Sequence, residues 1–537
     1  MFQSRPPPDP DGGFLQKEVV PVRQYETFEL SFSGAPLTDA WAQIDLQATF
    51  SCGDTVRTVK GFYDGDGRYI IRFLPEQAGT WRWKVTGCVE AEGEEVCEAA
   101  REQHGPVRAV STHFEYADGT LFIPFGTTVY ALASQEDALV EETLESLKNA
   151  PFNKVRMCVF PKDYDYNKNE PPCYAFEKKE NGSWDTGRPN VLFWQRFERI
   201  MDRIGAMGIQ VDLILFHPYD RWGFAGLPQK NNLEYLDYLL RRFSAKPYIW
   251  WSLANEYDIN MDVKSLADWE EIEEYVADND PYHHLLSNHN CMCFWDHTRP
   301  NITHASLQTK ALTEIPRWIR EYQKPVVIDE CCYEGNLPYL WGSISGQEMV
   351  RRFWRCYASG GYCTHGETFL SDDDILWWGK GGKLKGESPR RIAFLRQIME
   401  SLPGPLTPSS GGITAIAQMD EASLEKALST LPEEMRHAMT LFGKSIHRMD
   451  IQNRSLHLAG EHIWEAHCSE DAYLWFNDLQ CYGEQTLRLP KDKKYRVEVI
   501  DIWKMTRETI CETASGETKI KLPGRENLAV LAMKVEG

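Results

Sequence analysis

Hydrophobic and polar positions change their period along the chain, and the first change separates an N-terminal segment from the centre. Between residues 14 and 110 there is no helical periodicity, and apolar side chains alternate with polar ones in short runs separated by turn residues. The runs are residues 27–32, 40–50, 68–73 and 80–85. Alternation with a period of two is typical of strands buried on one face. Several short strands at this spacing predict an N-terminal β-sandwich, which we assign to residues 1–113.

From residue 114 the pattern changes to short apolar runs that alternate with segments of helical periodicity. The predicted strands are residues 121–128, 154–160, 209–216, 248–254, 285–290, 302–308, 325–330 and 361–369. The predicted helices are residues 136–149, 193–207, 232–243, 314–322, 347–358 and 392–401. Eight strands in this alternation predict a (β/α)8 TIM barrel over residues 114–404.

The pattern breaks again at residues 401–412, where Pro, Gly and Ser are frequent and a linker is expected. Beyond it, residues 423–442 have a helical pattern, and strands are predicted at residues 473–476, 495–501 and 528–533. We therefore expect a C-terminal β-sandwich over residues 405–537. The fold class is a multidomain α/β plus all-β chain, with the barrel flanked by two β-sandwich domains.

Two predicted barrel strands end on a glutamate. The fourth strand runs out at Asn255 and Glu256, and the seventh ends at Glu330. In parallel α/β barrels, polar residues at the carboxyl ends of strands point into the active-site mouth. Two carboxylates so placed are what the cleavage of a glycosidic bond requires.

Asn255 and Glu256 after an apolar strand, followed by Glu330 at the end of a later one, resemble clan A of the glycoside hydrolases. The central region is most similar to the apiosidase-like, family-5-like branch. The strand-seven motif of that branch, N-G-E-P-x-Y-E, here reads I-D-E-C-C-Y-E over residues 328–334, with Cys331 in place of Pro. The resemblance implies a retaining enzyme in which Glu256 is the acid/base and Glu330 the nucleophile.

The flanking segments also carry resemblances. Residues 61–67, 72–75 and 79–81 resemble an N-terminal sandwich module of glycoside hydrolases, and residues 500–506 resemble a small C-terminal module found behind such barrels.

The same resemblance implies roles in substrate binding. Asn255 would donate to the sugar 2-hydroxyl, and Arg156, at the end of strand two, would hold the nucleophile ionised, unless it forms a salt bridge to another carboxylate of the barrel wall. Tyr333 would donate to Glu330. Of the neighbouring Trp377 and Trp378, one is expected to form the platform of the first sugar subsite and the other to belong to the core, and we assign the platform to Trp378.

Further candidates follow other strand ends. They are His217, His289 and His365 after strands three, five and eight, Trp222 as a pocket wall, and the additional carboxylates Glu334 and Glu367. At least one or two of the histidines are expected to line a sugar pocket. A metal site built from all three, or purely structural histidines, are the alternatives, and we expect no metal and no cofactor. Glu334 is the alternative nucleophile.

Charge and composition limit the classes of molecule that the protein is expected to bind. A net charge of −21 argues against nucleic acids and anionic membranes. No signal-peptide core and no long apolar run occurs, and the 14 Cys lack paired ligand motifs, so a cytoplasmic protein with reduced thiols is expected.

The predicted function is that of a retaining glycoside hydrolase that removes terminal sugars from oligosaccharides or small glycosides. An endo-acting glycanase of the same clan, a carbohydrate-binding protein on a catalytically inactive barrel, and a metal-dependent hydrolase are the alternatives. Assembly into a homo-oligomer stays open.

Overall fold

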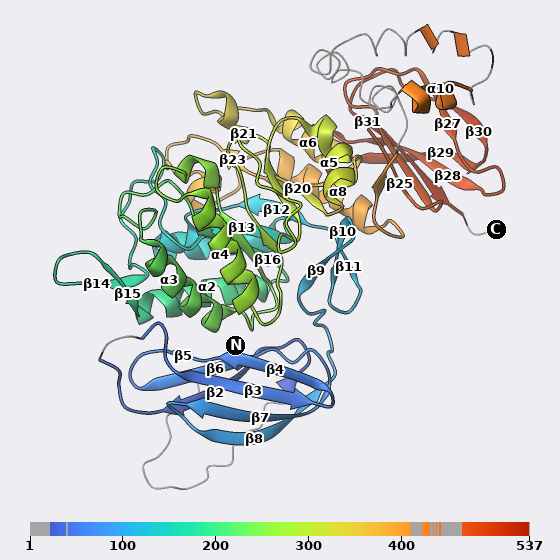
Figure 1. Ribbon diagram of the computed structural model, residues 1–537. Coiled ribbons are helices and arrows are strands. Elements are labelled where there is room, and N and C mark those ends of the chain that lie inside the picture. The colour runs from blue at the N-terminus through green and yellow to red at the C-terminus, as the bar shows by residue number, and fades with distance from the viewer. Residues whose placement is uncertain are drawn as a thin grey trace.

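The computed structural model describes residues 22–38, 41–409, 421–429, 433, 436–437, 440–441 and 464–535. Figure 1 shows three parts, with a blue β domain at one end, a barrel in the centre and a red β domain at the other end. The predicted barrel with a β domain on either side is confirmed. Part of the predicted linker (410–412) lies outside the described residues. Of the helix predicted at 423–442, the structure describes α10 (Glu421–Ser429) and isolated positions beyond it.

The N-terminal domain consists of two packed sheets. One has the order β1 (Val22–Arg23), β8 (Ala91–Glu98), β7 (Gly79–Gly87), β3 (Leu46–Cys52) and β4 (Thr55–Lys60). The other has the order β2 (Phe28–Ser33), β6 (Arg68–Phe73) and β5 (Phe62–Tyr63). Alternate residues of β3 are buried, and Phe50 stacks on Phe73 of the facing sheet at 4.0 Å between ring centroids. The period-two pattern of the sequence is thus the inner face of a sandwich.

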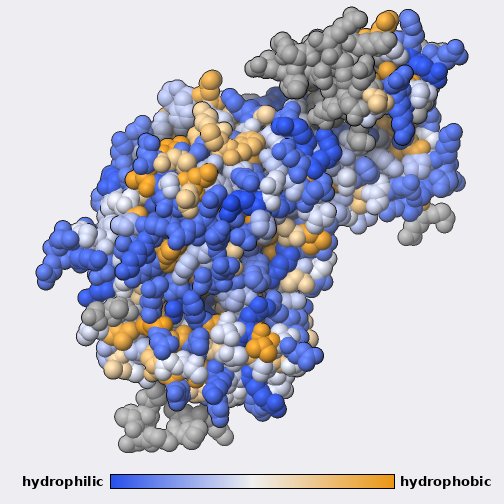
Figure 2. Space-filling view, in the orientation of Figure 1, coloured by the Kyte–Doolittle hydropathy of each residue, from blue (hydrophilic) through white to orange (hydrophobic). Residues whose placement is uncertain are grey.

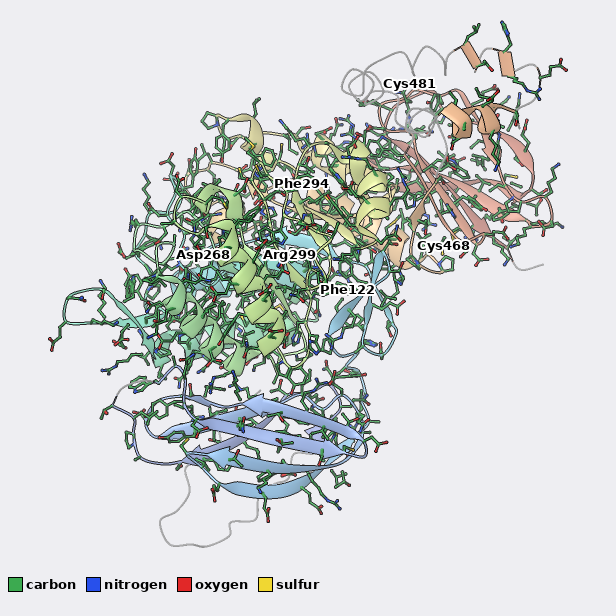
Figure 3. All side chains as sticks on the ribbon, in the orientation of Figure 1. Phe122, Asp268, Phe294, Arg299, Cys468 and Cys481 are labelled. Atoms are coloured by element: carbon green, nitrogen blue, oxygen red, sulfur yellow. The ribbon has the colours of Figure 1, made fainter. Side chains whose placement is uncertain are left out.

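A small antiparallel sheet follows, made of β9 (Val107–Val110), β10 (His113–Tyr116) and β11 (Leu121–Phe122). Its Phe114 packs against Trp250 and Tyr362, at the amino ends of two barrel strands, with ring centroids 5.1 and 5.3 Å away. Phe122 contacts Trp250 as well and lies between this sheet and the barrel (Figure 3). The sheet therefore closes the amino-terminal mouth of the barrel and leaves the carboxyl-terminal mouth for a ligand.

The barrel has eight parallel strands. In spatial order they are β18 (Leu286–Ser287), β17 (Ile249–Ala254), β16 (Gln210–Phe216), β13 (Lys154–Cys158), β12 (Phe125–Thr128), β22 (Tyr362–His365), β20 (Val326–Glu330) and β19 (Ala305–Gln308). The ring closes between the two ends of this order, where His289 bridges Ser306 in parallel. The Asn290 side-chain amide also donates to the Gln308 carbonyl and accepts from the Gln308 N–H, both at 3.1 Å. We call residues 289–290 with 306–308 the closure seam.

The helices surround the barrel. They are α1 (Asp137–Asn149), α2 (Val191–Gly205), α3 (Gln229–Phe243), α4 (Leu266–Asn279), α5 (Ile315–Tyr322), α6 (Gly346–Tyr357) and α8 (Ser388–Glu400). The sequence pattern missed α4 and the hairpin β14 (Phe176–Lys178) to β15 (Trp184–Pro189). Only Trp269, Ile272 and Val276 of α4 are buried apolar residues, so its hydrophobic stripe is thin. Pro124 also interrupts the predicted first strand, which leaves β11 and β12 as separate elements.

The C-terminal domain has a six-stranded sheet and a two-stranded sheet. The sheet has the order β24 (Thr407–Pro408), β25 (Trp464–Cys468), β26 (Ala472–Phe476), β31 (Leu528–Lys534), β28 (Tyr495–Asp501) and β29 (Thr506–Ala514). In the two-stranded sheet, β27 (Glu484–Arg488) pairs antiparallel with β30 (Glu517–Lys521). Buried Cys468 lies where this sheet meets the barrel (Figure 3), and the two share one hydrophobic cluster.

Where the N-terminal domain meets helices α2 and α3, buried charges accompany apolar contacts, since Ala42, Phe62 and Ile70 belong to a hydrophobic cluster of the barrel. Arg72 and Arg242 both pair with Glu198 at 2.6–2.8 Å, and Arg242 also pairs with Asp64 at 2.7 Å. Their guanidinium groups lie 4.9 and 4.8 Å from the ring centroid of Phe62. We call Arg72, Arg242, Glu198, Asp64 and Phe62 the charged interface.

The visible surface is mainly hydrophilic, with hydrophobic residues in small groups (Figure 2). Among the described residues, no helix combines the length and the apolar character that crossing a membrane requires.

Candidate active site

Glu256 and Glu330 line a single cavity at the carboxyl-terminal mouth of the barrel, with a volume of about 340 Å³. Both side chains are almost fully buried, with 6% and 4% of their residue surface exposed. The lining residues are Tyr130, Lys162, Tyr164, Asp165, Tyr166, Tyr219, Asn255, Glu256, Gln308, Glu330, Tyr333, Tyr339, Trp341 and Trp378. The cavity thus combines two carboxylates with an aromatic wall, as expected of a site that binds a sugar.

Glu256 occupies a strained backbone position directly after β17. Its φ of 59° and ψ of 53° lie in the left-handed region, which costs a residue other than glycine about 1 kcal/mol or more. Contacts with the closure seam hold this turn, because the Glu256 N–H donates to His289 Nδ1 at 3.4 Å and the Tyr257 N–H donates to the His289 carbonyl at 3.0 Å. The Asn255 amide donates to Glu256 Oε2 at 3.1 Å.

Glu330 ends β20 and is held by a tyrosine from another strand end. The Tyr130 hydroxyl donates to Glu330 Oε1, and His289 Nε2 lies 4.0 Å from the same oxygen. Burial and the Glu256 carboxylate raise the pKa of Glu330, while Lys162 and the Tyr130 hydroxyl act in the opposite direction. Glu330 is therefore harder to ionise while the Glu256 carboxylate is charged. The Tyr333 hydroxyl, expected to donate to Glu330, makes no hydrogen bond to a described residue.

His289 connects the two carboxylates. Burial lowers its pKa well below the ordinary value, so the imidazole is neutral. Because Nδ1 accepts the Glu256 N–H, the ring proton belongs on Nε2, which faces Glu330. His289 itself is fully buried and does not line the cavity.

Arg156 lies below the cavity in the barrel interior. Its fully buried guanidinium is within ion-pair distance of Asp212 (3.4 Å) and Asp329 (4.0 Å), and it makes no hydrogen bond to any other described residue. Lys154 pairs with the same two carboxylates at 2.8 and 2.6 Å. Despite burial, these two cations lower the pKa of Asp329. The predicted contact with the nucleophile is not formed, and the alternative salt bridge to wall carboxylates is.

The other two candidate histidines lie away from the cavity. His217 is buried, with Nε2 3.2 Å from the Phe160 carbonyl, and burial lowers its pKa to about 3. His365 stacks on Phe152 at 4.8 Å between ring centroids, and its Nδ1 lies 3.1 Å from Thr127 Oγ1. The three predicted histidines therefore do not converge on a common metal position.

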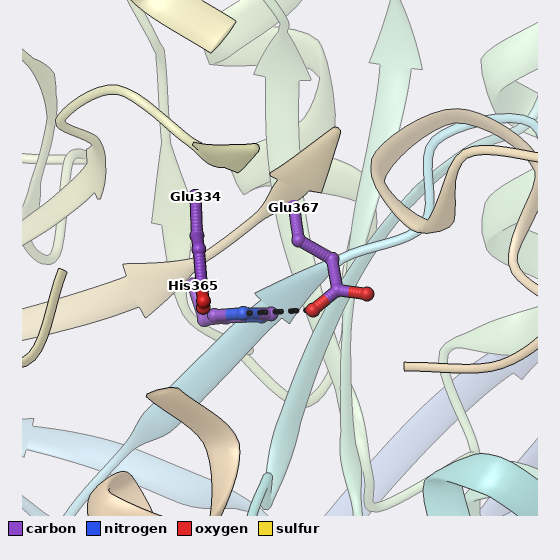
Figure 4. A group of neighbouring side chains, drawn as sticks. All are labelled: Glu334, His365 and Glu367. Atoms are coloured by element: carbon purple, nitrogen blue, oxygen red, sulfur yellow. Dashed lines mark ion pairs between the residues drawn. The ribbon is translucent and has the colours of Figure 1, made fainter. Parts of the chain in front are cut away.

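His365 instead belongs to a buried group with Glu334 and Glu367, whose ligand atoms lie within 4.8 Å of one another (Figure 4). This is the one group of metal-ligand type in the part of the chain that the structure describes. The carboxylates already accept four backbone N–H groups, from residues 385–388. A Cβ atom at Gly386 would collide with both carboxylates. The group thus anchors the start of α8, and Glu334 lies outside the cavity.

The tryptophans divide between cavity and core. Trp378 lines the cavity beside Tyr164 and Tyr333, with ring centroids 4.8 and 5.7 Å away. Trp377 is buried and donates to Thr127 Oγ1. Trp222 is half-exposed, donates to Glu170 and does not line the cavity.

Several cavity residues were not among the sequence candidates. They are Tyr130, Lys162, Tyr164, Asp165, Tyr166, Tyr219, Gln308, Tyr339 and Trp341. Tyr130 follows the first strand, Lys162 the second and Tyr219 the third. The strand-end rule that selected Glu256 and Glu330 would have selected these three as well.

Family models match all three parts of the chain. Residues 109–403, more than half of the chain, match the "Apiosidase-like, catalytic domain" model. Residues 21–87 and 463–533 match two domains of unknown function, DUF5060 and DUF5605. No protein with a curated description matches this chain.

Solved structures extend the likeness to the whole chain. A protein from Bacteroides vulgatus ATCC 8482, described as a candidate glycoside hydrolase, is 33% identical, with a TM-score of 0.81 over 96% of this chain and 99% of that one. A family 5 glycoside hydrolase from the same organism is 14% identical, with a TM-score of 0.54 over 80% of this chain and 94% of that one, and shows a likeness of fold. The chain therefore belongs to the apiosidase-like family and is a glycoside hydrolase.

Proposed function

We propose that the protein is a retaining glycosidase that removes terminal sugars from oligosaccharides or small glycosides by double displacement. The observation that carries this proposal is that Glu256 and Glu330 line one aromatic-walled cavity at the carboxyl ends of β17 and β20. Two carboxyl side chains that face one sugar-sized cavity can divide the roles of proton donor and nucleophile that such a mechanism needs.

In the first step Glu330 attacks the anomeric carbon, and the bond to the leaving oxygen breaks while Glu256 protonates that oxygen. This forms a covalent glycosyl ester on Glu330. In the second step Glu256 takes a proton from water, and the resulting nucleophile displaces Glu330 from the anomeric carbon. Asn255 is placed beside Glu256 to bind the sugar hydroxyl next to the reacting carbon.

The size of the cavity supports a short substrate. Its volume of about 340 Å³ is at the small end of the roughly 300–1,000 Å³ common for small-molecule sites. The aromatic rings of Tyr164, Tyr339, Trp341 and Trp378 would stack on the apolar faces of a terminal sugar and of the group next to it. The products formed from an oligosaccharide distinguish the two modes of action. Release of single sugars indicates exo-action, and release of internal fragments indicates endo-action.

The test is a panel of aryl glycosides given to the wild type, Glu330→Ala and Glu256→Ala. We expect one sugar to be hydrolysed, and either substitution to lower kcat by at least about 10³-fold, because each removes a reacting group. Azide should restore turnover of Glu330→Ala and give a glycosyl azide of inverted configuration, because azide then occupies the place of the nucleophile.

Asp372→Asn serves as the matched control, because Asp372 is an exposed carboxylate after β23 (Glu367–Thr368) and does not line the cavity. It should retain wild-type activity. Activity that survives Glu330→Ala without azide would contradict the assignment of the nucleophile. A glycosyl azide of retained configuration would contradict it equally.

A further inference from the structure

Lys162 is a cation at the wall of the cavity with an unusual environment. It lies in the loop after β13, lines the cavity, and only 3% of its surface is exposed. Its ammonium lies 3.9 Å from the ring centroid of Tyr130 and 4.4 Å from that of Tyr219. A buried cation between two aromatic faces is held by cation–π attraction, which strengthens when water is excluded.

These two rings belong to the residues that face the reacting carboxyls. The Tyr130 hydroxyl donates to Glu330, and the Glu256 carboxylate contributes, after burial, to a raised pKa of Tyr219. A positive charge over a phenol ring makes its hydroxyl a stronger donor. Lys162 therefore affects both Glu330 and Glu256, directly by its charge and through the hydroxyls of Tyr130 and Tyr219.

Lys162 has no anionic partner of its own. Within the described ranges it forms no ion pair, and its ammonium lies against the rings of Tyr130, Tyr164 and Tyr219. A buried ammonium without a carboxylate at contact distance is costly unless it balances charge nearby. The nearby charge is that of the two glutamates. Among the groups that lower the pKa of Glu330, the charge of Lys162 has the largest effect.

The other charges that face Glu330 are Glu256 and Arg156. Arg156 is shared between Asp212 and Asp329 below the cavity, so its charge is already balanced. The neutral titratable groups around Glu330 are Tyr130, Cys158, Tyr219, His289, Cys291, Tyr333 and Tyr339. Lys162 is thus the cation among these groups that has no competing carboxylate.

We propose that Lys162 is the positioning residue whose charge keeps Glu330 ionised for attack. Arg156 does not fill this role, because it pairs with Asp212 and Asp329 in the barrel interior. The inference rests on the proposed function, because it assigns to Glu330 the part of nucleophile. Lys162 acts through Glu330 and its two tyrosine neighbours, and it takes no part in bond making or proton transfer.

The inference is tested first without any substrate. Protein labelled with ¹³C at the glutamate carboxyl is titrated by NMR, and the Glu330 signal is identified by its loss in Glu330→Gln. In Lys162→Met the pKa of Glu330 should rise by about 1–2 units, because removal of an opposite charge at close range has an effect of that size. Lys162→Arg keeps the charge and should restore most of the wild-type value.

Lys264→Met is the matched control. Lys264 is also buried, lies 5.2 Å from the ring centroid of Phe216 and donates to the Ala225 carbonyl, but it does not line the cavity. It should leave the Glu330 titration unchanged. Thermal melting of each variant establishes that it is folded before it is titrated.

With a substrate in hand, the acidic limb of kcat/KM against pH should move upward in Lys162→Met by the same amount as the NMR titration, and Lys162→Arg should move it back. An unchanged Glu330 titration in folded Lys162→Met overturns the inference, even if the enzyme hydrolyses glycosides. Failure to hydrolyse any glycoside overturns the proposed function instead, and the NMR result then stands by itself as a statement about charge.

Discussion

At the scale of single residues, the two glutamates depend on side chains that follow other strands. Glu330 ends β20, but its hydrogen bond comes from Tyr130 after β12 and its facing imidazole from His289 after β18. Glu256 ends β17 and is held in its left-handed conformation by the same His289. Each reacting group is therefore positioned by residues far from it in sequence.

Tyr130→Phe tests this dependence. The substitution removes the donor to Glu330 and keeps the ring, and a hydrogen bond to a charged group contributes about 1.5–3 kcal/mol. We expect kcat/KM to fall about 10- to 100-fold, with the acidic limb of the pH profile moved upward because a donor to the ionised form is lost.

Tyr235→Phe is the matched control, since the buried Tyr235 hydroxyl donates to the Leu215 carbonyl at 3.3 Å, away from the cavity. Equal losses of kcat/KM in the two variants would mean that Tyr130 matters for packing and not for Glu330.

At the scale of elements, the eight barrel strands could be predicted because each is a short apolar run ended by a polar cluster. Both glutamates followed from that rule. The aromatic wall did not, because Tyr164, Tyr339 and Trp341 lie in loops whose course depends on tertiary contacts. The interior position of Arg156 could not be predicted either, because its partners Asp212 and Asp329 come from strands far apart in sequence.

Glu334→Gln is a prediction about how an element is anchored. Glu334 accepts the N–H groups of Glu387 and Ser388 at the start of α8, where a negative charge is favourable. An amide offers one acceptor for two donors, so the free energy of unfolding should fall by about 1–3 kcal/mol in denaturant titrations.

The same variant separates the two candidate nucleophiles. If activity is lost in Glu334→Gln, and azide restores it with inversion in Glu334→Ala, where the shorter side chain leaves room for azide, then Glu334 and not Glu330 is the nucleophile. Retained activity in a destabilised protein is the expected result.

At the scale of the whole molecule, both flanking domains share hydrophobic clusters with the barrel, and each adds its own ion pairs. The C-terminal sheet shares a hydrophobic cluster with the barrel, and Arg355 of α6 adds a two-pronged pair to Asp478 at 2.8 and 3.0 Å. The N-terminal domain contributes Ala42, Phe62 and Ile70 to a barrel cluster and adds the charged interface around Phe62. Both attachments lie away from the cavity-lining residues.

The stability of the whole chain should depend on pH through its buried histidines. Burial lowers the pKa of His217, His297, His304 and His365 to about 3, against about 6.5 in an unfolded chain. The unfolded chain therefore binds more protons between about pH 6.5 and 3, and stability falls as pH falls through this window.

Glu367, whose pKa burial raises to about 7, acts in the opposite direction between about pH 7 and 4, because the folded chain then binds more protons, and the raised pKa of Glu330 acts in the same sense. The histidines are the larger set. The midpoint of thermal unfolding should therefore decrease steadily from pH 6.5 to 4, and His297→Gln, away from the cavity, should make the decrease shallower. A midpoint that is constant or rises over this range would contradict the expectation.

The charged interface also bears on how such chains can be recombined in evolution. A hydrophobic contact tolerates exchange of one β domain for another of similar shape, but Arg72 and Asp64 enter with the N-terminal domain while Glu198 and Arg242 belong to the barrel helices. A barrel given a foreign domain would keep the pair of Glu198 and Arg242 but would lose Arg72 from Glu198 and Asp64 from Arg242, and removing members of a buried charge network is destabilising. We therefore expect the N-terminal domain and the barrel to have been inherited together, with substitutions on one side of the charged interface compensated by substitutions on the other side.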